Sequence, residues 1–219
     1  MSITPESVKD LLNSEDFGER IRGLNQLRQI ETETAFNMVQ PMVTDENTRV
    51  RYAAVSQLDT LGTVDKDLSL EMLRDRLFND PEPDVQAAAA DAIGGLKLVE
   101  AYEDLAKVYR DTSEWLVQFS IIAALGELGD PRGFALLKEA LHSNNNLLQT
   151  AAIGSMGELG NDEAIPLLAE FADHEDWQIR YRLVQALGRL GGAEAERIIT
   201  LLTEDESEQV AKEAKNNLK

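Results

Sequence analysis

The sequence predicts an all-α protein, an α-solenoid of about seven helical hairpins that form a single curved domain. The first observation is a motif, Leu125–Asp130 (LGELGD), which begins again at Met156 and at Leu187, 31 residues later each time. The second is that apolar residues between these motifs fall at helical spacing. Self-similarity at a period of roughly 20–50 residues is typical of stacked repeats, in which each unit buries its apolar face against its neighbours.

The repeat register extends over the whole chain. Equivalent residues, here called the reference positions, follow one another at steps of 31, 35, 32, 31, 31 and 31 residues: Arg20, Arg51, Gln86, Gln118, Gln149, Arg180 and Ala211. We therefore expect one domain over residues 1–219, with repeats at about 4–31, 32–62, 63–98, 99–129, 130–160, 161–191 and 192–219. The four extra residues of the second step predict a longer connection near Gly62–Asp65.

Each repeat reads as two amphipathic helices. In the sixth repeat, residues 179–190 place apolar side chains at 179, 183, 186, 187 and 190, the spacing of one helix face. A shorter helix over 164–171 precedes it, with Pro166 in the first turn, where a missing N–H is tolerated. Gly191 and Gly192 follow the second helix and are expected to end it.

Composition excludes several classes of function. The chain has 21 Lys and Arg residues against 40 Asp and Glu residues, a net charge of −19, which opposes binding to a phosphate backbone. It has no cysteine, so thiol chemistry, disulfides and thiolate metal sites are excluded. No stretch approaches the roughly 20 apolar residues of a membrane helix, and Met1–Glu6 lacks the features of a signal peptide, so we expect a cytoplasmic protein.

The residues six places before the reference positions are mostly able to cap a helix, and we expect them to cap the second helices. They are Ser14, Asp45, Asp80, Thr112, Ser143, His174 and Asp205. An acid followed six residues later by arginine, as in Asp45 and Arg51, resembles the Asp/Arg ladder of HEAT repeats. We assign Arg20, Arg51 and Arg180 to this ladder because a guanidinium pairs bidentately with a carboxylate.

The motif Ala-Leu-Gly-x-Leu-Gly at residues 124–129 and 186–191 resembles the HEAT-like repeats of the E/F-type phycobilin lyases and their relatives. The resemblance is greatest to phycobilisome degradation proteins of the NblB type. It implies phycobiliprotein subunits as partners, phycocyanin above all, and aid in detaching their phycocyanobilin. The alternatives are one subunit of a heterodimeric phycocyanobilin lyase, with a second HEAT-like subunit as partner, and a non-catalytic scaffold for a partner helix.

A helical wheel places five positions of each second helix on the concave surface, at −2, +1, +2, +5 and +9 from the reference position. We expect the middle repeats to present an uncharged strip there, with aromatic rings and arginines towards the ends. The candidate groove residues are Arg22, Arg49, Tyr52, Ala87, Leu116, Phe119, Glu127, Leu147, Thr150, Glu158, Tyr181, Arg182, Gln185 and Arg189. For Leu116 and Leu147, packing between helices is an equally good interpretation.

A bilin is flat and apolar with two propionates, which suits rings, small residues and arginines, and Glu127 and Glu158 are placed to accept hydrogen bonds from pyrrole N–H groups. Since the chain has no cysteine, it holds no bilin covalently, and any such ligand is transient. Trp115 and Trp177 occupy equivalent positions, and we expect them to join neighbouring repeats rather than to contact a ligand.

No catalytic residue is assigned, and whether the protein is an enzyme is left open. His174 occupies a cap position, which favours a structural role. The HEAT-like deoxyhypusine hydroxylases hold two irons with several His-Glu pairs, but His174-Glu175 is the one such pair in this sequence, so no metal site is expected. HEAT-like DNA glycosylases need a basic groove, and a net charge of −19 argues against them.

Overall fold

The computed structural model describes residues 3–218, and within them the chain forms seven consecutive helix pairs and no β-strand. The first helices are α1 (Pro5–Leu12), α3 (Thr32–Val39), α5 (Lys66–Asn79), α7 (Tyr102–Asp111), α9 (Gly133–Leu141), α11 (Ala164–Ala169) and α13 (Gly192–Leu202). The second helices are α2 (Phe17–Gln26), α4 (Thr48–Leu61), α6 (Pro83–Gly95), α8 (Trp115–Leu128), α10 (Asn146–Leu159), α12 (Trp177–Leu190) and α14 (Glu208–Asn217). The predicted all-α solenoid of helical hairpins is confirmed. Residues 1, 2 and 219, which the expected domain limits include, lie outside the described residues.

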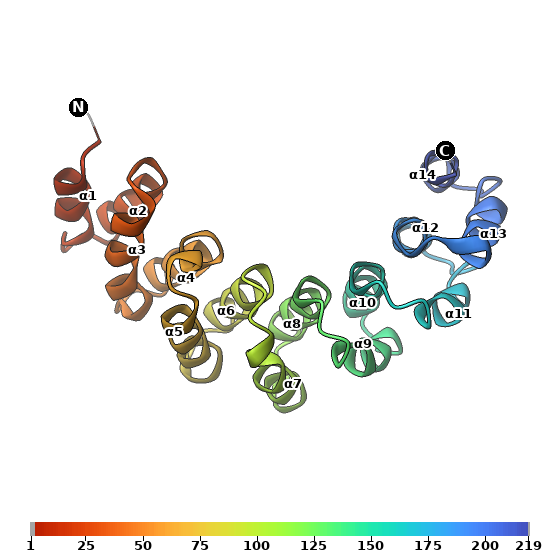
Figure 1. The fold of residues 1–219 in the computed structure, drawn as a ribbon, viewed down its shortest axis with the longest axis horizontal. Helices are drawn as coiled ribbons and strands as arrows, with labels where there is room; N and C mark the ends of the chain where they lie inside the picture. The colour runs from red at the N-terminus through yellow and green to blue at the C-terminus, as the bar shows by residue number, and fades with distance from the viewer. Residues whose placement is uncertain (1–2, 219) are drawn as a thin grey trace. The chain divides into compact units, whose positions relative to one another are not determined.

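The chain divides into two compact units, Met1–Ile121 and Ile122–Lys219. In each unit the first helices form one row and the second helices another (Figure 1). The core lies between the rows: Leu24, Leu58 and Leu73 are fully buried in the N-terminal unit, and Leu136 and Leu183 in the C-terminal unit. Short 3-10 helices, η1 (Leu27–Gln29), η2 (Gln40–Thr44), η3 (Gly62–Val64) and η4 (Val99–Ala101), supplement the connections of the N-terminal unit.

The loop inside each hairpin has the same hydrogen bond in all seven repeats. The side chain six residues before the reference position accepts the backbone N–H two residues further on, at 2.7–3.2 Å, as Asp45 does from Asn47 and His174 Nδ1 does from Asp176. The expectation that these side chains cap the second helices is therefore wrong. They form turns, and side chains two residues later, such as Asp176, are the caps of several second helices.

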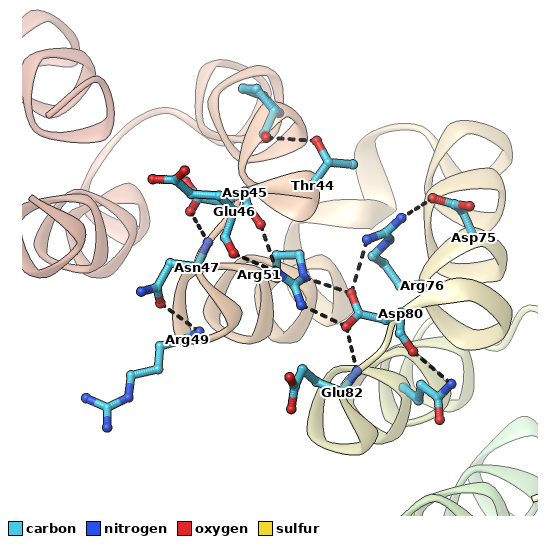
Figure 2. A network of polar contacts seen from close by, with 12 residues as sticks. Thr44, Asp45, Glu46, Asn47, Arg49, Arg51, Asp75, Arg76, Asp80 and Glu82 are labelled. Carbon is cyan, nitrogen blue, oxygen red and sulfur yellow. Dashed lines mark hydrogen bonds and ion pairs between the residues drawn. The ribbon is translucent and has the colours of Figure 1, made fainter. Parts of the chain in front are cut away.

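The Asp/Arg ladder is confirmed at three places. Arg51 donates from Nε and Nη2 to the two carboxylate oxygens of Asp80, at 2.8 and 3.0 Å (Figure 2). Arg180 pairs with Asp205 in the same bidentate way, whereas Arg20 donates one hydrogen bond from Nη2 to Asp45 Oδ1, with Nε 2.9 Å from Oδ2 as an ion-pair contact. Each pair joins one repeat to the next. Where glutamine replaces arginine, as at Gln86, the amide donates to a backbone carbonyl of its own repeat instead.

The two glycines of the repeated motif have different functions. A Cβ on Gly157 would lie 2.7 Å from the Cα of Ala186, so glycine is what allows α10 and α12 to approach closely, and Gly126 has the same relation to Ser155. Gly160 has a φ of +72°, which places it in the left-handed region that ends α10. The motif thus fixes both the spacing of the second helices and their ends.

We expected the four extra residues of the third repeat to lengthen the connection at Gly62–Asp65. This expectation is wrong. That segment is the single 3-10 turn η3, and Asp65 is already the cap of α5. The first helix α5 is 14 residues long, against 6–11 in the other first helices, and so contains the additional residues. Among the described residues, no helix is long and apolar enough to cross a membrane.

Candidate binding face of the second helices

In the N-terminal unit, the candidate residues Arg49 and Tyr52 lie together on α4. Tyr52 is 48% exposed, and with Thr48 and Asp84 the two line a small cavity of about 200 Å³. Arg22 is also exposed, but its guanidinium lies 3.0 Å from Glu19, one turn earlier on α2. The unit therefore presents an aromatic ring beside an exposed guanidinium, as the sequence predicted.

The small residues of the expected uncharged strip are not exposed surface. Ala87 is only 4% exposed, and Ala88, Ala151 and Gly154 are also buried. These positions carry small side chains because neighbouring second helices pack closely against them, so the helix wheel placed them on the correct face but not at its surface. Ala87 is therefore corrected from a groove residue to a packing residue, while Leu116 and Phe119 are half-buried.

In the C-terminal unit, Leu147 is 51% exposed on α10, which decides against core packing for that residue. Thr150 is half-buried and donates its hydroxyl to the carbonyl of Asn146. Tyr181 on α12 is half-buried, and its hydroxyl lies 3.3 Å from Glu213 Oε2 of α14. Trp177 packs edge-on against Tyr181, with ring centroids 6.4 Å apart.

The guanidinium of Arg182 packs against Gly154 of α10. A Cβ on Gly154 would come within 2.5 Å of its guanidinium, so the absence of a side chain at Gly154 makes room for it. Arg182 Nη1 donates to Gln185 at 3.3 Å, whereas its buried Nε has no hydrogen-bond acceptor within the described part of the chain. Gln185 in turn donates to Glu213, at 3.4 Å. Arg182, Gln185 and Tyr181 thus form one network that ends on Glu213.

Of the remaining three candidates, Arg189 and Glu158 form an ion pair with each other. Arg189 Nη1 lies 2.5 Å from Glu158 Oε1, with half of the arginine side chain exposed. Glu127 is exposed on α8. Since Arg22 and Arg189 are each paired with a glutamate of the same face, the basic ends that we expected are largely neutralised, and Arg49 and Arg182 are the candidate arginines without a carboxylate partner among the described residues.

The sequence analysis underestimated how exposed two tryptophans are. Trp115 and Trp177 are 49% and 41% exposed, so about half of each ring is left open to solvent, and the aromatic contact of Trp177 is with Tyr181 of its own helix. They are the first residues of α8 and α12, just beyond the hairpin loops. Their equivalent places in the repeat were visible in the sequence, but a first-turn residue can point either into the stack or out of it.

An acidic pair on the same face was also missed. Asp91 is exposed, but partial desolvation by α6 and its neighbours and the negative charge of Asp59 raise its pKa, and the hydrogen bond with Ser120 only partly offsets them. Asp59 also lies against the backbone of Gly95, where a Cβ would meet its carboxylate. This part of α4 and α6 is therefore polar, in contrast to the ring of Tyr52 nearer the start of α4.

The histidines and carboxylates of the described residues support no catalytic assignment. Within residues 3–218, no group of three His, Asp or Glu side chains is arranged to hold a metal ion. His174 accepts a backbone N–H in its loop and stacks on Phe171, with ring centroids 6.1 Å apart. These contacts confirm its structural role.

Comparison with known proteins decides the family. A model of HEAT repeats matches residues 70–156 and 135–219. The chain belongs to the HEAT-repeat family. No curated protein sequence matches this HEAT-repeat protein.

Among solved structures, the complex of CpcE and CpcF of phycocyanin lyase from Nostoc sp. PCC7120 is similar, with 21% identity, a TM-score of 0.67 and coverage of 100% of this chain and 94% of the other. YibA of Escherichia coli is 15% identical, with a TM-score of 0.62 and coverage of 99% and 92%. An engineered protein is 19% identical, with a TM-score of 0.62 and coverage of 97% and 67%. These likenesses establish the fold.

Proposed function

We propose that this HEAT-repeat protein binds phycobiliprotein subunits and their bilin through the exposed face of its second helices. In this proposal it acts as one subunit of a lyase-type pair, with a second HEAT-like chain and phycocyanin as partners. The full-length likeness to the phycocyanin lyase complex supports the pair, and the motif resemblance supports the ligand class.

The observation that carries the proposal is the exposed ring of Tyr52 next to the exposed guanidinium of Arg49. Tyr52, which is 48% exposed, lines a small cavity with Arg49, and half-buried Tyr181 and Arg182 belong to one hydrogen-bond network in the second unit. A linear tetrapyrrole needs apolar and aromatic contact along its length and cations for its two propionates. In a chain with a net charge of −19, an arginine without a carboxylate partner next to an exposed ring is a specific arrangement.

Titration of free phycocyanobilin into the protein tests the ligand. Binding is expected to change the bilin absorption spectrum, because a bound bilin is held in one conformation. Tyr52→Ala and Arg49→Gln are expected to weaken binding several-fold. Phe78→Ala is the matched control, because Phe78 is a similarly exposed ring on the first helix α5. A spectrum that does not change on mixing would overturn the proposal, and equal losses in Tyr52→Ala and Phe78→Ala would overturn the assignment of the face.

The direction of the reaction is tested with the partner. With apo-phycocyanin, free bilin and the second HEAT-like subunit, a lyase subunit is expected to accelerate covalent attachment. With intact phycocyanin, a degradation factor is expected to bleach or release the chromophore, which is the role predicted from the NblB-type resemblance. A protein that binds phycocyanin but changes neither spectrum is a scaffold for a partner helix.

A further inference from the structure

The hairpin loops of the last two repeats form a second feature, here called the acidic cavity, lined by residues that the proposed function does not use. It has a volume of about 390 Å³. Its lining residues are Ala172, Asp173, Arg180, Leu201, Leu202, Glu204, Asp205 and Glu206. They come from the turn after α11, from α12, from the end of α13 and from the loop before α14.

Carboxylates dominate this lining. Four acidic residues face a single guanidinium, and that guanidinium is fully used: Arg180 donates to both oxygens of Asp205, to Glu206 at 3.3 Å and to the backbone carbonyls of His174 and Glu175. Asp173 and Glu204 form no ion pair within the described residues. The cavity therefore retains an uncompensated negative charge.

The backbone adds to this charge. Helix α13 ends at Leu202, so the carbonyl groups of its last turn, which form the negative end of the helix dipole, lie at the cavity. Its last turn contains no basic residue. Both the side chains and the helix end thus favour a cation.

An apolar contact lies beside the charge. Leu201 is 71% exposed, the highest value among the exposed large hydrophobic side chains, and Ala172 and Leu202 line the cavity with it. Lysine and arginine bury their methylene stems on apolar surface while their charged ends reach polar groups. The combination of Leu201 with unpaired carboxylates fits such a side chain.

We propose that the acidic cavity is a docking site for an extended, basic segment of a partner protein, one with a lysine or arginine next to an apolar residue. Charge complementarity selects this occupant: the excess of carboxylates repels nucleic acids and anionic membranes. Carboxylates of this lining already bind a guanidinium within the molecule, because Asp205 and Glu206 accept hydrogen bonds from Arg180. This inference stands apart from the bilin proposal and uses none of its residues.

The probe is a blocked hexapeptide, Gly-Leu-Lys-Arg-Leu-Gly, titrated into the full-length protein by calorimetry at low salt. We expect saturable binding that weakens as sodium chloride is added. The same peptide with serine in place of lysine and arginine is expected not to bind. Absence of binding by the basic peptide at millimolar concentration would overturn the proposal.

Variants separate the site from general attraction to an acidic protein. Asp173→Asn with Glu204→Gln is expected to weaken binding at least fivefold. The control, Glu194→Gln with Glu196→Gln, removes the same charge from exposed positions on α13 that do not line the cavity, and it is expected to change binding less than twofold. Equal weakening in both would show that the attraction is diffuse and would overturn the site.

A third variant tests the apolar contact. Leu201→Ala is expected to weaken binding threefold or more without changing its salt dependence, because the charges remain. Circular dichroism should show unchanged helicity in all variants, since the side chains replaced are at the surface. Unchanged affinity in Leu201→Ala would refute the apolar part of the docking site.

Discussion

Replacing Asp80 with asparagine removes the negative partner from the most deeply buried step of the ladder. The carboxylate of Asp80 is 0% exposed and accepts from Arg51 twice, from Arg76 at 3.1 Å and from the backbone N–H of Glu82 at 3.1 Å. Without that charge, the guanidinium of Arg51, whose side chain is only 9% exposed, remains poorly hydrated and unpaired.

The magnitude follows from these contacts. Removing one partner of a buried ion pair costs about 3–5 kcal/mol of unfolding free energy. Because Arg51 keeps the carbonyls of Asp45 and Glu46 as acceptors, we expect the lower end, about 3 kcal/mol. Asp75→Asn is the control, since Asp75 also contacts Arg76 but is half exposed, and it should cost about 0.5 kcal/mol or less.

Urea unfolding followed by circular dichroism at 222 nm measures both values. The double variant Arg51→Met, Asp80→Leu should be less destabilised than the sum of its single changes, because an apolar pair leaves no charge unpaired. A loss for Asp80→Asn no larger than that for Asp75→Asn, or additive costs in the double variant, would refute the reasoning that the ladder charges are coupled.

The same pair predicts a pH dependence. Burial raises the pKa of Asp80, but hydrogen bonds from Arg51 and Glu82 and the charges of Arg51 and Arg76 outweigh it, so the pKa is lowered. A lowered pKa in the folded state stabilises the fold above the ordinary carboxyl pKa of about 4, and this contribution is lost as the pH falls through the lowered value. The difference between the wild type and Asp80→Asn should therefore be largest near neutral pH and shrink below about pH 4.

Two further predictions concern the second helices. Gly157→Ala should destabilise the protein by about 1–3 kcal/mol in urea unfolding, because its Cβ would meet the backbone of Ala186; a neutral effect would show that α10 and α12 separate easily. Asp91→Asn should raise the melting temperature at pH 7, because partial desolvation and the charge of Asp59 oppose ionisation despite the bond with Ser120; this gain should shrink as the pH falls and be lost below about pH 4, and a gain that persists there would contradict the electrostatic cause.

The sequence located much of the candidate face, but it could not predict which of its residues are buried or which of its charges are paired. The wheel put Tyr52 and Leu147 on the exposed face, and both are about half exposed. It failed for Ala87, because the depth of a small side chain depends on how closely the next helix approaches. It also could not show that Arg189 is paired with Glu158, since the two lie on different helices, 31 residues apart.

The sequence by itself determined the period, the helix pairs and the arginines of the ladder, because these depend on residue spacing within one repeat and on its copies. The tertiary structure alone decided which charges are neutralised, which small residues are covered and where Leu201 and the unpaired carboxylates form a cavity. Those properties depend on the distance and rotation between neighbouring helices, and no pattern along a single helix specifies them.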